Sequence, residues 1–562
     1  MTTFPERLQA LHAQTPDRVA ITLQFSGRED LAITYDQLLS ASSRFAQTLE
    51  HEGIRSGEVV VLILQHGEDL IYSFWGAILQ GAIPSIMPFL TEKLSPERYK
   101  ADLSTLISVT KPAAIVTYPE FEGNVRAALQ KDDSVRSVMV ADHMEAQTKI
   151  DFASLKGFQR NPADIVLLQH SSGTTGLQKG VALSHQAIFN QLNSYSKALS
   201  MAEDDLIISW LPLYHDMGLI AGFLMPILSG IPVVLMSPFD WVRAPYKLLQ
   251  SISKYHGTLT WLPNFAYNFC AQKIRDRHIE NVDLSSLRAI INCSEPVRWE
   301  SHVTFYERFK NYGLKFEALQ TSYAMAENVF SVTQSPLGDV PVVEEIDREA
   351  FMLERVAKNS LDGRPFMKMM SSGQPLENVK MKVVDENGSE LSERIIGELA
   401  LQSDCMLTGY FNRPDLTENA FRNGWYLTGD YGYISNGEVF VSGRKKDLII
   451  VGGKNVYPQD VETLTYEVSG VHAGRSVAFG MFDETQGTED VVVIAEVDSE
   501  DVEEQRRIAD AIRLHVTKNS AIALRYVKVV GPKWILKTSS GKTARAANKD
   551  KFLLELQIGR EN

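Results

Sequence analysis

The chain has 562 residues, of which 44% are hydrophobic and 22% charged, so it can bury extended cores and is neither disordered nor fibrous. Its 56 Lys and Arg against 70 Asp and Glu give a formal charge of −14. Surfaces that hold nucleic acid or anionic lipid are rich in basic side chains. We therefore expect no nucleic acid among the partners of this protein.

Short apolar runs alternate with longer periodic segments from residue 20 to about 320. The runs include VVVLIL at 59–64, PAAIVTY at 112–118 and LIISWL at 206–211. Continuous apolar runs separated by helical patterns are typical of parallel sheets that are covered on both faces. The sequence therefore predicts an α/β protein with parallel-type sheets.

An uncharged stretch at 219–236 approaches the length needed to cross a bilayer. Pro226, Gly230 and Pro232 divide it into pieces of ordinary core length. We expect a buried helix that ends near Gly230 and a buried strand at 232–236, and no stable membrane insertion.

The cysteines and the first residues indicate a reducing, cytoplasmic location. Cys270, Cys293 and Cys405 are far apart and odd in number, so they offer neither a disulfide framework nor a zinc spacing. The opening residues contain no apolar run long enough for a signal peptide.

The charge and the periodicity of the sequence change twice after residue 340. Residues 340–370 are charged and weakly periodic, which indicates an inserted surface segment, and residues 377–450 have the turn signals of a β-rich lobe. From about Ser442 onward, helical and strand patterns alternate in a way that predicts a small α+β domain.

The segment HSSGTTGLQKGV at 170–181 follows an apolar strand and has the residues of a phosphate-binding loop. Glycines let the backbone approach an anion, hydroxyls donate to it, and a lysine adds a charge. It is not a Walker loop, because Leu177 follows the second glycine. A flexible exposed turn is the structural alternative. The candidate triphosphate-binding residues are Ser171, Ser172, Gly173, Thr174, Thr175, Gly176 and Lys179.

Taken in chain order, a set of motifs resembles the core motifs of the ANL adenylate-forming superfamily, which includes acyl-CoA ligases, nonribosomal adenylation domains and luciferases. The amino-acid sequences of these motifs are most similar to those of the fatty acyl-AMP ligases. Besides the loop, the motifs are WLPLYHDMG (210–218), INCSEPV (291–297), TSYAMAE (321–327), GWYLTGDYGYI (424–434), GRKKDLIIVGGKNVYPQDVE (443–462) and KTSSGKTAR (537–545).

The resemblance implies a fold and a domain division. We expect an N-terminal adenylation core at 1–442, with two parallel-type sheets, helices and a β-rich lobe, and a mobile α+β domain at 443–562. An insertion at about 336–371 resembles the one that restricts this domain and disfavours CoA in fatty acyl-AMP ligases. Lys446 lies where the family has its hinge, although a charge run at a linker is more often only solvated.

The resemblance also implies catalytic roles. Lys542 matches the lysine that bridges the substrate carboxylate and the α-phosphate of ATP, Glu327 matches the ligand of Mg²⁺, and His215 matches the histidine beside the acyl carboxylate. Hard oxygen ligands next to a triphosphate suit Mg²⁺. The alternatives without a catalytic role are a solvated surface lysine at Lys542 and a structural histidine at His215.

Nucleotide and acyl contacts complete the expected site. Asp430 and Arg444 should reach the ribose, and the aromatic and apolar segment 261–270 with Trp210 should line the acyl pocket. A buried structural tyrosine is the alternative to an adenine contact at Tyr323. The expected adenine residues are Ser294, Glu295, Pro296, Ser322 and Tyr323, and the expected acyl residues are Trp210, Asn264, Phe265 and Tyr267.

The sequence thus predicts an enzyme that uses ATP and Mg²⁺ to convert a fatty acid to acyl-AMP and then acylates the phosphopantetheine thiol of a carrier protein. An acyl-CoA ligase with the same first half-reaction is one alternative. A catalytically silent protein that binds nucleotide or acyl-adenylate is another.

Overall fold

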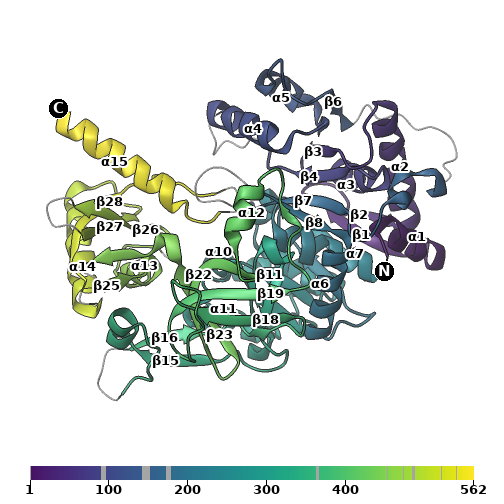
Figure 1. The fold of residues 1–562 in the computed structure, drawn as a ribbon. Coiled ribbons are helices and arrows are strands. Elements are labelled where there is room, and N and C mark those ends of the chain that lie inside the picture. Colours follow the sequence, from purple (N-terminus) through teal and green to yellow (C-terminus); the bar gives the residue numbers. More distant parts are fainter. Residues whose placement is uncertain are drawn as a thin grey trace.

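The first part of the chain forms large sheets that have helices on their faces. The computed structural model describes residues 2–89, 96–141, 152–171, 179–361, 366–451, 454–472, 474–483, 488–520, 522–538 and 541–561. Figure 1 shows a large body in purple to green and a smaller yellow body formed by the chain after β23. The α/β architecture predicted from the sequence is confirmed.

The first sheet has the strand order β17-β14-β13-β12-β11-β9-β10-β1-β2. Its strands pair in parallel from β1 across to β13, whereas β2, β14 and β17 pair antiparallel at the edges. In sequence order the strands are β1 (Val19–Gln24), β2 (Leu31–Thr34), β9 (Ile207–Ser209), β10 (Val233–Met236), β11 (Leu259–Leu262), β12 (Ala289–Asn292), β13 (Leu319–Ala324), β14 (Ser331–Gln334) and β17 (Gln374–Pro375).

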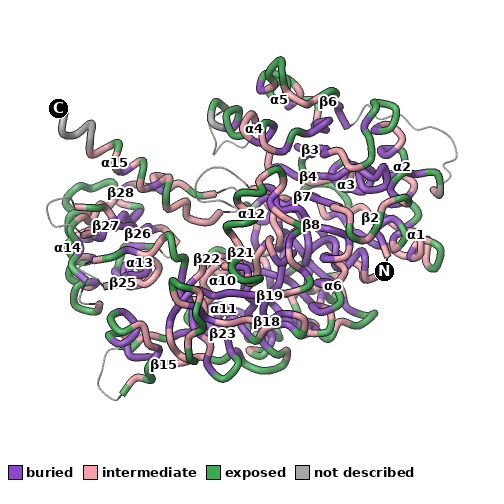
Figure 2. Tube along the Cα trace, viewed as in Figure 1, coloured by how far each residue is buried: buried purple, intermediate pink, exposed green. Residues whose placement is uncertain are grey.

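The second sheet has the order β20-β8-β7-β4-β3-β5-β6. Every residue of β3 is buried, which is what an apolar strand covered on both faces requires. Figure 2 shows the same contrast, with buried strands inside and exposed helix surfaces outside. The strands are β3 (Val59–Ile63), β4 (Ile83–Ile86), β5 (Ala114–Thr117), β6 (Ser137–Val140), β7 (Ile165–Ser171), β8 (Lys179–Ser184) and β20 (Gly409–Tyr410).

Local signals in the sequence start and stop the helices. At α2, for example, Thr34 and Gln37 form a capping box, in which each side chain accepts from the other residue's backbone N–H. The helices of the large body are α1 (Phe4–Gln14), α2 (Tyr35–His51), α3 (Glu68–Leu79), α4 (Pro96–Thr110), α5 (Glu122–Ala128), α6 (His185–Ala198), α7 (Met225–Ser229), α8 (Pro238–Arg243), α9 (Tyr246–Tyr255), α10 (Asn264–Lys273), α11 (Trp299–Phe309) and α12 (Pro414–Ala420).

The uncharged stretch at 219–236 folds as predicted, into buried helix followed by buried strand. Helices η5 (Met217–Leu224) and α7 end at Gly230, whose φ of +84° reverses the chain before β10 begins at Val233. Among the described helices, none combines the length and the apolar character required to span a bilayer.

An antiparallel lobe and a small α+β unit complete the fold. The lobe has the order β18-β19-β22-β21, with β23 on β22, and β23 extends through the predicted boundary at 442 to Arg444. In the small unit, β26, β27 and β28 form a sheet, and α13 and α14 pack against it. The elements are β18 (Val379–Val384), β19 (Gly397–Ser403), β21 (Phe421–Arg422), β22 (Trp425–Ser435), β23 (Glu438–Arg444), β24 (Ile449–Val451), β25 (Lys454–Val456), α13 (Pro458–Tyr466), β26 (Ser476–Asp483), β27 (Thr488–Glu496), α14 (Val502–Ser520), β28 (Leu524–Val530) and α15 (Arg545–Glu561).

The charged segment at 340–370 folds as a hairpin of β15 (Val343–Asp347) and β16 (Phe366–Met370) with the helical turn η10 (Ala350–Glu354). Glu344 anchors it to the lobe, because its carboxylate accepts from Arg394 Nη1 at 2.8 Å and from the hydroxyls of Tyr433 and Ser435, each at 2.9 Å. A carboxylate with a charged partner and two hydroxyl donors is a strong attachment.

The same hairpin also contacts the small C-terminal unit. Arg348 Nη1 donates to the backbone oxygen of Asn519 at 2.6 Å, and the rings of Phe351 and Tyr457 lie 5.7 Å apart. Met352 is buried in the apolar core of the C-terminal unit. The insertion therefore joins the lobe to the C-terminal unit.

We predict that one buried histidine, His185, makes unfolding pH-dependent. Its Nδ1 accepts from the Phe4 N–H at 3.1 Å, and burial, with a smaller contribution from Arg160, lowers its pKa to about 4. The unfolded chain, with a histidine pKa near 6.5, binds the proton first as the pH falls, so protonation favours unfolding between pH 6.5 and 4.

The His185→Gln variant lacks this proton-binding site. Between pH 7 and 4.5 its free energy of unfolding should fall by about 2 kcal/mol less than that of the wild type, as measured by urea titration at each pH. Parallel pH profiles of the two proteins would contradict a neutral buried imidazole.

Candidate active site

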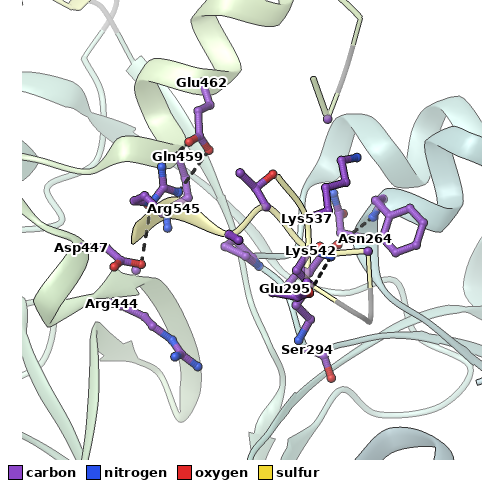
Figure 3. Close-up of a pocket in the computed structure, with 18 of the residues that line it drawn as sticks. Asn264, Ser294, Glu295, Arg444, Asp447, Gln459, Glu462, Lys537, Lys542 and Arg545 are labelled. Atoms are coloured by element: carbon purple, nitrogen blue, oxygen red, sulfur yellow. Dashed lines mark hydrogen bonds and ion pairs between the residues drawn. The ribbon is translucent and has the colours of Figure 1, made fainter. Parts of the chain in front are cut away.

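A cavity of about 1440 Å³ lies between the large body and the C-terminal unit and is lined by both. Figure 3 shows Asn264, Ser294 and Glu295 from the large body next to Lys537 and Lys542 from the C-terminal unit. Most of the residues expected at the nucleotide and at the reacting carboxylate therefore line one continuous space.

The loop that carries Lys542 is a tight turn closed by its own backbone. The Thr538 N–H donates to the Lys542 oxygen at 2.7 Å, and the Lys542 N–H donates to Thr538 Oγ1 at 3.1 Å. Gly541 has a φ of +85°, and a Cβ there would lie 3.5 Å from the ring of Phe265. The turn thus rests against α10 and holds Lys542 at the cavity.

His215 and Asp216 lie where the charge of Lys542 acts on them. Burial lowers the pKa of His215 to about 3, with Lys542 adding to the effect, and His215 Nε2 is buried without a partner among the described residues. Burial raises the pKa of Asp216, and Lys542 opposes that change. A neutral imidazole with one free nitrogen therefore faces a cavity in which the lysine supplies positive charge.

Asp430 lies beside Tyr323 and Arg444 at another part of the cavity. The Tyr323 hydroxyl donates to Asp430 Oδ2 at 2.6 Å, and Arg444 Nε is 3.5 Å from Oδ1. Asp430 and Arg444 are direct partners across β22 and β23, so the lobe sheet sets their spacing. Burial raises the pKa of Asp430, and both neighbours oppose it.

Glu327 and Lys179 meet at the ring of Tyr410. The Tyr410 hydroxyl donates to Glu327 Oε1 at 2.9 Å, and Lys179 Nζ lies 4.6 Å from the centroid of the same ring. Burial raises the pKa of Glu327, which the Tyr410 bond and Lys179 oppose. Within the described ranges, Tyr410 is the one other residue from which the Glu327 carboxylate accepts a hydrogen bond, so its Oε2 could bind a cation.

The glycine-rich loop lies outside the described residues from 172 to 178, which includes Ser172, Gly173, Thr174, Thr175 and Gly176. Its two ends are placed: Ser171 ends β7, Lys179 begins β8, and the two residues pair across the antiparallel hairpin. Both ends of the loop are therefore held in the second sheet.

The expected adenine residues line the cavity, but one side chain has a different task. Ser294, Glu295, Pro296, Ser322 and Tyr323 all contribute to the wall. Glu295 Oε2, however, accepts from the Phe265 N–H at 2.8 Å at the first turn of α10. One oxygen of the Glu295 carboxylate is therefore engaged at the N-terminus of that helix.

The apolar part of the cavity depends on residues that the sequence interpretation did not single out. Phe265 and Asn264 line it as expected, together with a larger set from the segment after β4 and from α4, α8 and α10. Spacing of apolar residues at 99, 103 and 106 along α4 was the available signal. The additional residues are Met87, Phe89, Tyr99, Leu103, Leu106, Phe239 and Phe269.

Trp210 and Tyr267 were expected in the acyl pocket, but neither is among the residues that line the cavity. Trp210 stacks on Trp241, with ring centroids 3.6 Å apart, in the layer behind the wall. Tyr267 is fully buried, and its hydroxyl donates to the Ile290 oxygen at 3.0 Å. The difference follows from helix geometry, because Tyr267 lies two residues from both Phe265 and Phe269, which line the cavity, and so points to the opposite face of α10, toward the sheet.

Lys446 lies in the turn η11 (Lys445–Asp447), between β23 of the lobe and β24 of the C-terminal unit. The residue is exposed. Its neighbour Asp447 lies 3.8 Å from Arg545, which also pairs with Glu462, so ion pairs flank the connection between the bodies.

Comparisons with known proteins agree with this geometry. A family model described as AMP-binding enzyme matches residues 8–411. The medium-chain-fatty-acid–acyl-carrier-protein ligase JamA of Moorena producens is 30% identical over 564 residues, covering 96% of this chain and 93% of its own. The long-chain-fatty-acid–AMP ligase FadD26 of Mycobacterium bovis is 28% identical over 581 residues, with coverages of 98% and 97%.

A solved structure supports the same relationship along the whole chain. It comes from a study of fatty acyl-adenylate ligases from E. coli and L. pneumophila, and it superimposes with a TM-score of 0.89 at 25% identity over 99% of both chains. The chain therefore belongs to the AMP-binding enzyme family and has the adenylate-forming fold that its motifs predicted.

Proposed function

We propose that this protein is a fatty acyl-AMP ligase. It converts a fatty acid and ATP to acyl-AMP and pyrophosphate, and then acylates the phosphopantetheine thiol of a separate carrier protein. The observation that carries the proposal is a cavity that is lined both by apolar side chains such as Met87 and Tyr99 and by Lys542, Asp430 and Arg444. An alkyl chain joined to a nucleotide matches that combination.

In the first half-reaction, a carboxylate oxygen attacks the α-phosphorus of ATP, the bond between the α-phosphorus and the bridging oxygen breaks, and pyrophosphate leaves. Two anions must approach each other, so positive charge at the point of attack lowers the barrier. Lys542 supplies that charge. His215, held neutral by burial, offers a hydrogen bond to the carboxylate and adds no charge.

Asp430 and Glu327 hold the nucleotide in this proposal. Asp430 accepts from the ribose hydroxyls, with its position fixed by Tyr323 and Arg444. Glu327 fits a magnesium ligand, because it is an acidic oxygen donor near the end of the phosphate-binding loop. Mg²⁺, when bound, offsets phosphate charge.

In the second half-reaction, the thiol sulfur attacks the acyl carbonyl, AMP leaves with the electron pair of the broken C–O bond, and the thiol proton is released. We propose that the domain at 443–562 turns about Lys446 between the two steps. The contacts of the insertion with Asn519 and Tyr457 restrict that turn. A restricted domain and the relative JamA, named for an acyl-carrier-protein acceptor, favour a carrier protein over CoA.

We predict that the Lys542→Ala variant forms acyl-AMP at least about 100-fold more slowly than the wild type, because the charge at the reacting centre is lost. Pyrophosphate release with fatty acids from acetate to palmitate is the measurement. Lys518→Ala, on the exposed surface of α14 in the same unit, is the matched control and should leave the rate unchanged. A wild type that releases no pyrophosphate with any acid would overturn the proposed activity.

We also predict that Glu327→Gln raises the Mg²⁺ concentration for half-maximal rate by about 10-fold or more, because a neutral amide is a weaker ligand for a hard cation. A Mg²⁺ titration of pyrophosphate release gives this number. The exposed Glu386→Gln change serves as the control. An unchanged Mg²⁺ requirement would remove Glu327 from the metal site.

The acceptor is tested by supplying either CoA or a holo carrier protein with ATP and a fatty acid. We expect acyl-carrier protein to form and acyl-CoA to form at least about 10-fold more slowly, since the insertion restricts the C-terminal unit. Mass spectrometry of both products decides. Efficient acyl-CoA formation would identify the protein as an acyl-CoA ligase instead.

A further inference from the structure

The amide of Asn264, the first residue of α10, is held with its oxygen turned away from the cavity. Asn264 Oδ1 accepts from Asn292 Nδ2 at 3.0 Å and from the backbone N–H of Arg298 at 3.2 Å. Its Nδ2 makes no hydrogen bond within the described part of the chain, and the residue lines the cavity. An amide donor is thus left at the wall.

The backbone of Arg298 decides this orientation. A peptide N–H can only donate, so it must face the oxygen and not the NH₂ group of Asn264. A flipped amide would place two donors against each other and would lose the bond. The direction of the Asn264 side chain therefore follows from a main-chain group that cannot change its role.

Asn292 and His302 extend the same constraint into the core. Because Asn264 Oδ1 accepts, Asn292 must present its NH₂ group, and its Nδ2 lies 3.1 Å from His302 Nε2 as well. His302 Nε2 must then accept, which requires a neutral imidazole. His302 is fully buried, burial lowers its pKa to about 3, and its ring stacks on Tyr267 with centroids 4.9 Å apart.

The donor lies close to the expected reacting centre. The ring of Phe265, the next residue of α10, is 3.5 Å from the point where a Cβ on Gly541 would lie. Gly541 directly precedes Lys542. The Phe265 N–H is already taken by Glu295, so it is not offered to a ligand. Figure 3 shows Asn264 beside Lys542 and Glu295 at the cavity.

We propose that Asn264 Nδ2 donates a hydrogen bond to an anionic oxygen at the point where the carboxylate and the α-phosphate react. Asn292 and His302 are positioning residues that keep this donor in the cavity. The proposal rests on the proposed adenylation. It adds a fixed neutral donor to the mobile charge of Lys542.

The sharpest test is Asn264→Asp, which keeps the inward acceptor for Arg298 and Asn292 but replaces the outward donor with an oxygen. We expect the rate constant for acyl-AMP formation to fall by at least about 100-fold, because a hydrogen bond to an anion is lost and repulsion is added. The KM for ATP should stay within about threefold. A change in KM alone, or an unchanged rate, would overturn the proposal.

The positioning role is tested at His302 with a matched pair. His302→Gln keeps an acceptor for Asn292 and should retain most of the rate, whereas His302→Leu should lose about 10-fold. Phe305→Leu, on the same buried face of α11, changes packing without changing these hydrogen bonds and should lower thermal stability only. Equal rates for the two His302 variants would contradict the positioning role.

Calorimetric binding of acyl sulfamoyl adenosine, an unreactive analogue of the adenylate, separates this inference from the proposed function. Asn264→Asp should bind it at least about 10-fold more weakly than the wild type even if turnover is never observed. A wild type that releases no pyrophosphate would sink the proposed function, whereas equal affinities of wild type and variant would sink only the inference about Asn264.

Discussion

The position of one ammonium group governs the rest of this structure. Lys542 belongs to the C-terminal unit, but the residues that would surround the nucleotide and the acyl chain belong to the large body. Two anions react only if a cation reaches the point where they meet. In the proposed reaction, the junction between the bodies is therefore part of the active site, and the ion pairs of Arg298 with Asp460 and of Arg545 with Asp447 lie across or beside it.

Burial divides the polar groups at and behind the cavity wall into charged and neutral ones. Burial keeps the imidazoles of His215 and His302 neutral at physiological pH. Lys542 and Arg444, in contrast, lie near the buried carboxyls of Asp216 and Asp430 and offset the rise in their pKa values. Neutral groups can thus fix geometry, while the few cations set the electrostatic potential where anionic substrates would bind.

The insertion at 336–371 ties these elements together mechanically. Glu344 attaches its hairpin to the lobe that also carries Asp430, and Arg348 and Phe351 attach it to the C-terminal unit. A movement of the C-terminal unit must break or carry these contacts. In the proposed reaction, this hairpin couples the choice of acceptor to the geometry of the lysine, which is the physical basis for expecting a selective second half-reaction.

Local pattern was enough to predict the parallel sheets and the helix and strand at 219–236, because burial and turn chemistry leave their mark on neighbouring residues. The resemblance of the motifs to a known family, and not local pattern, singled out Lys542, Asp430 and Tyr323, which the structure brings to one cavity. The sequence could not show that Glu295 caps α10, that Tyr267 faces the core or that α4 lines the apolar part. Those outcomes depend on how a helix is rotated against a sheet and on pairs that are 23 and 30 residues apart, and only packing of the whole chain decides them.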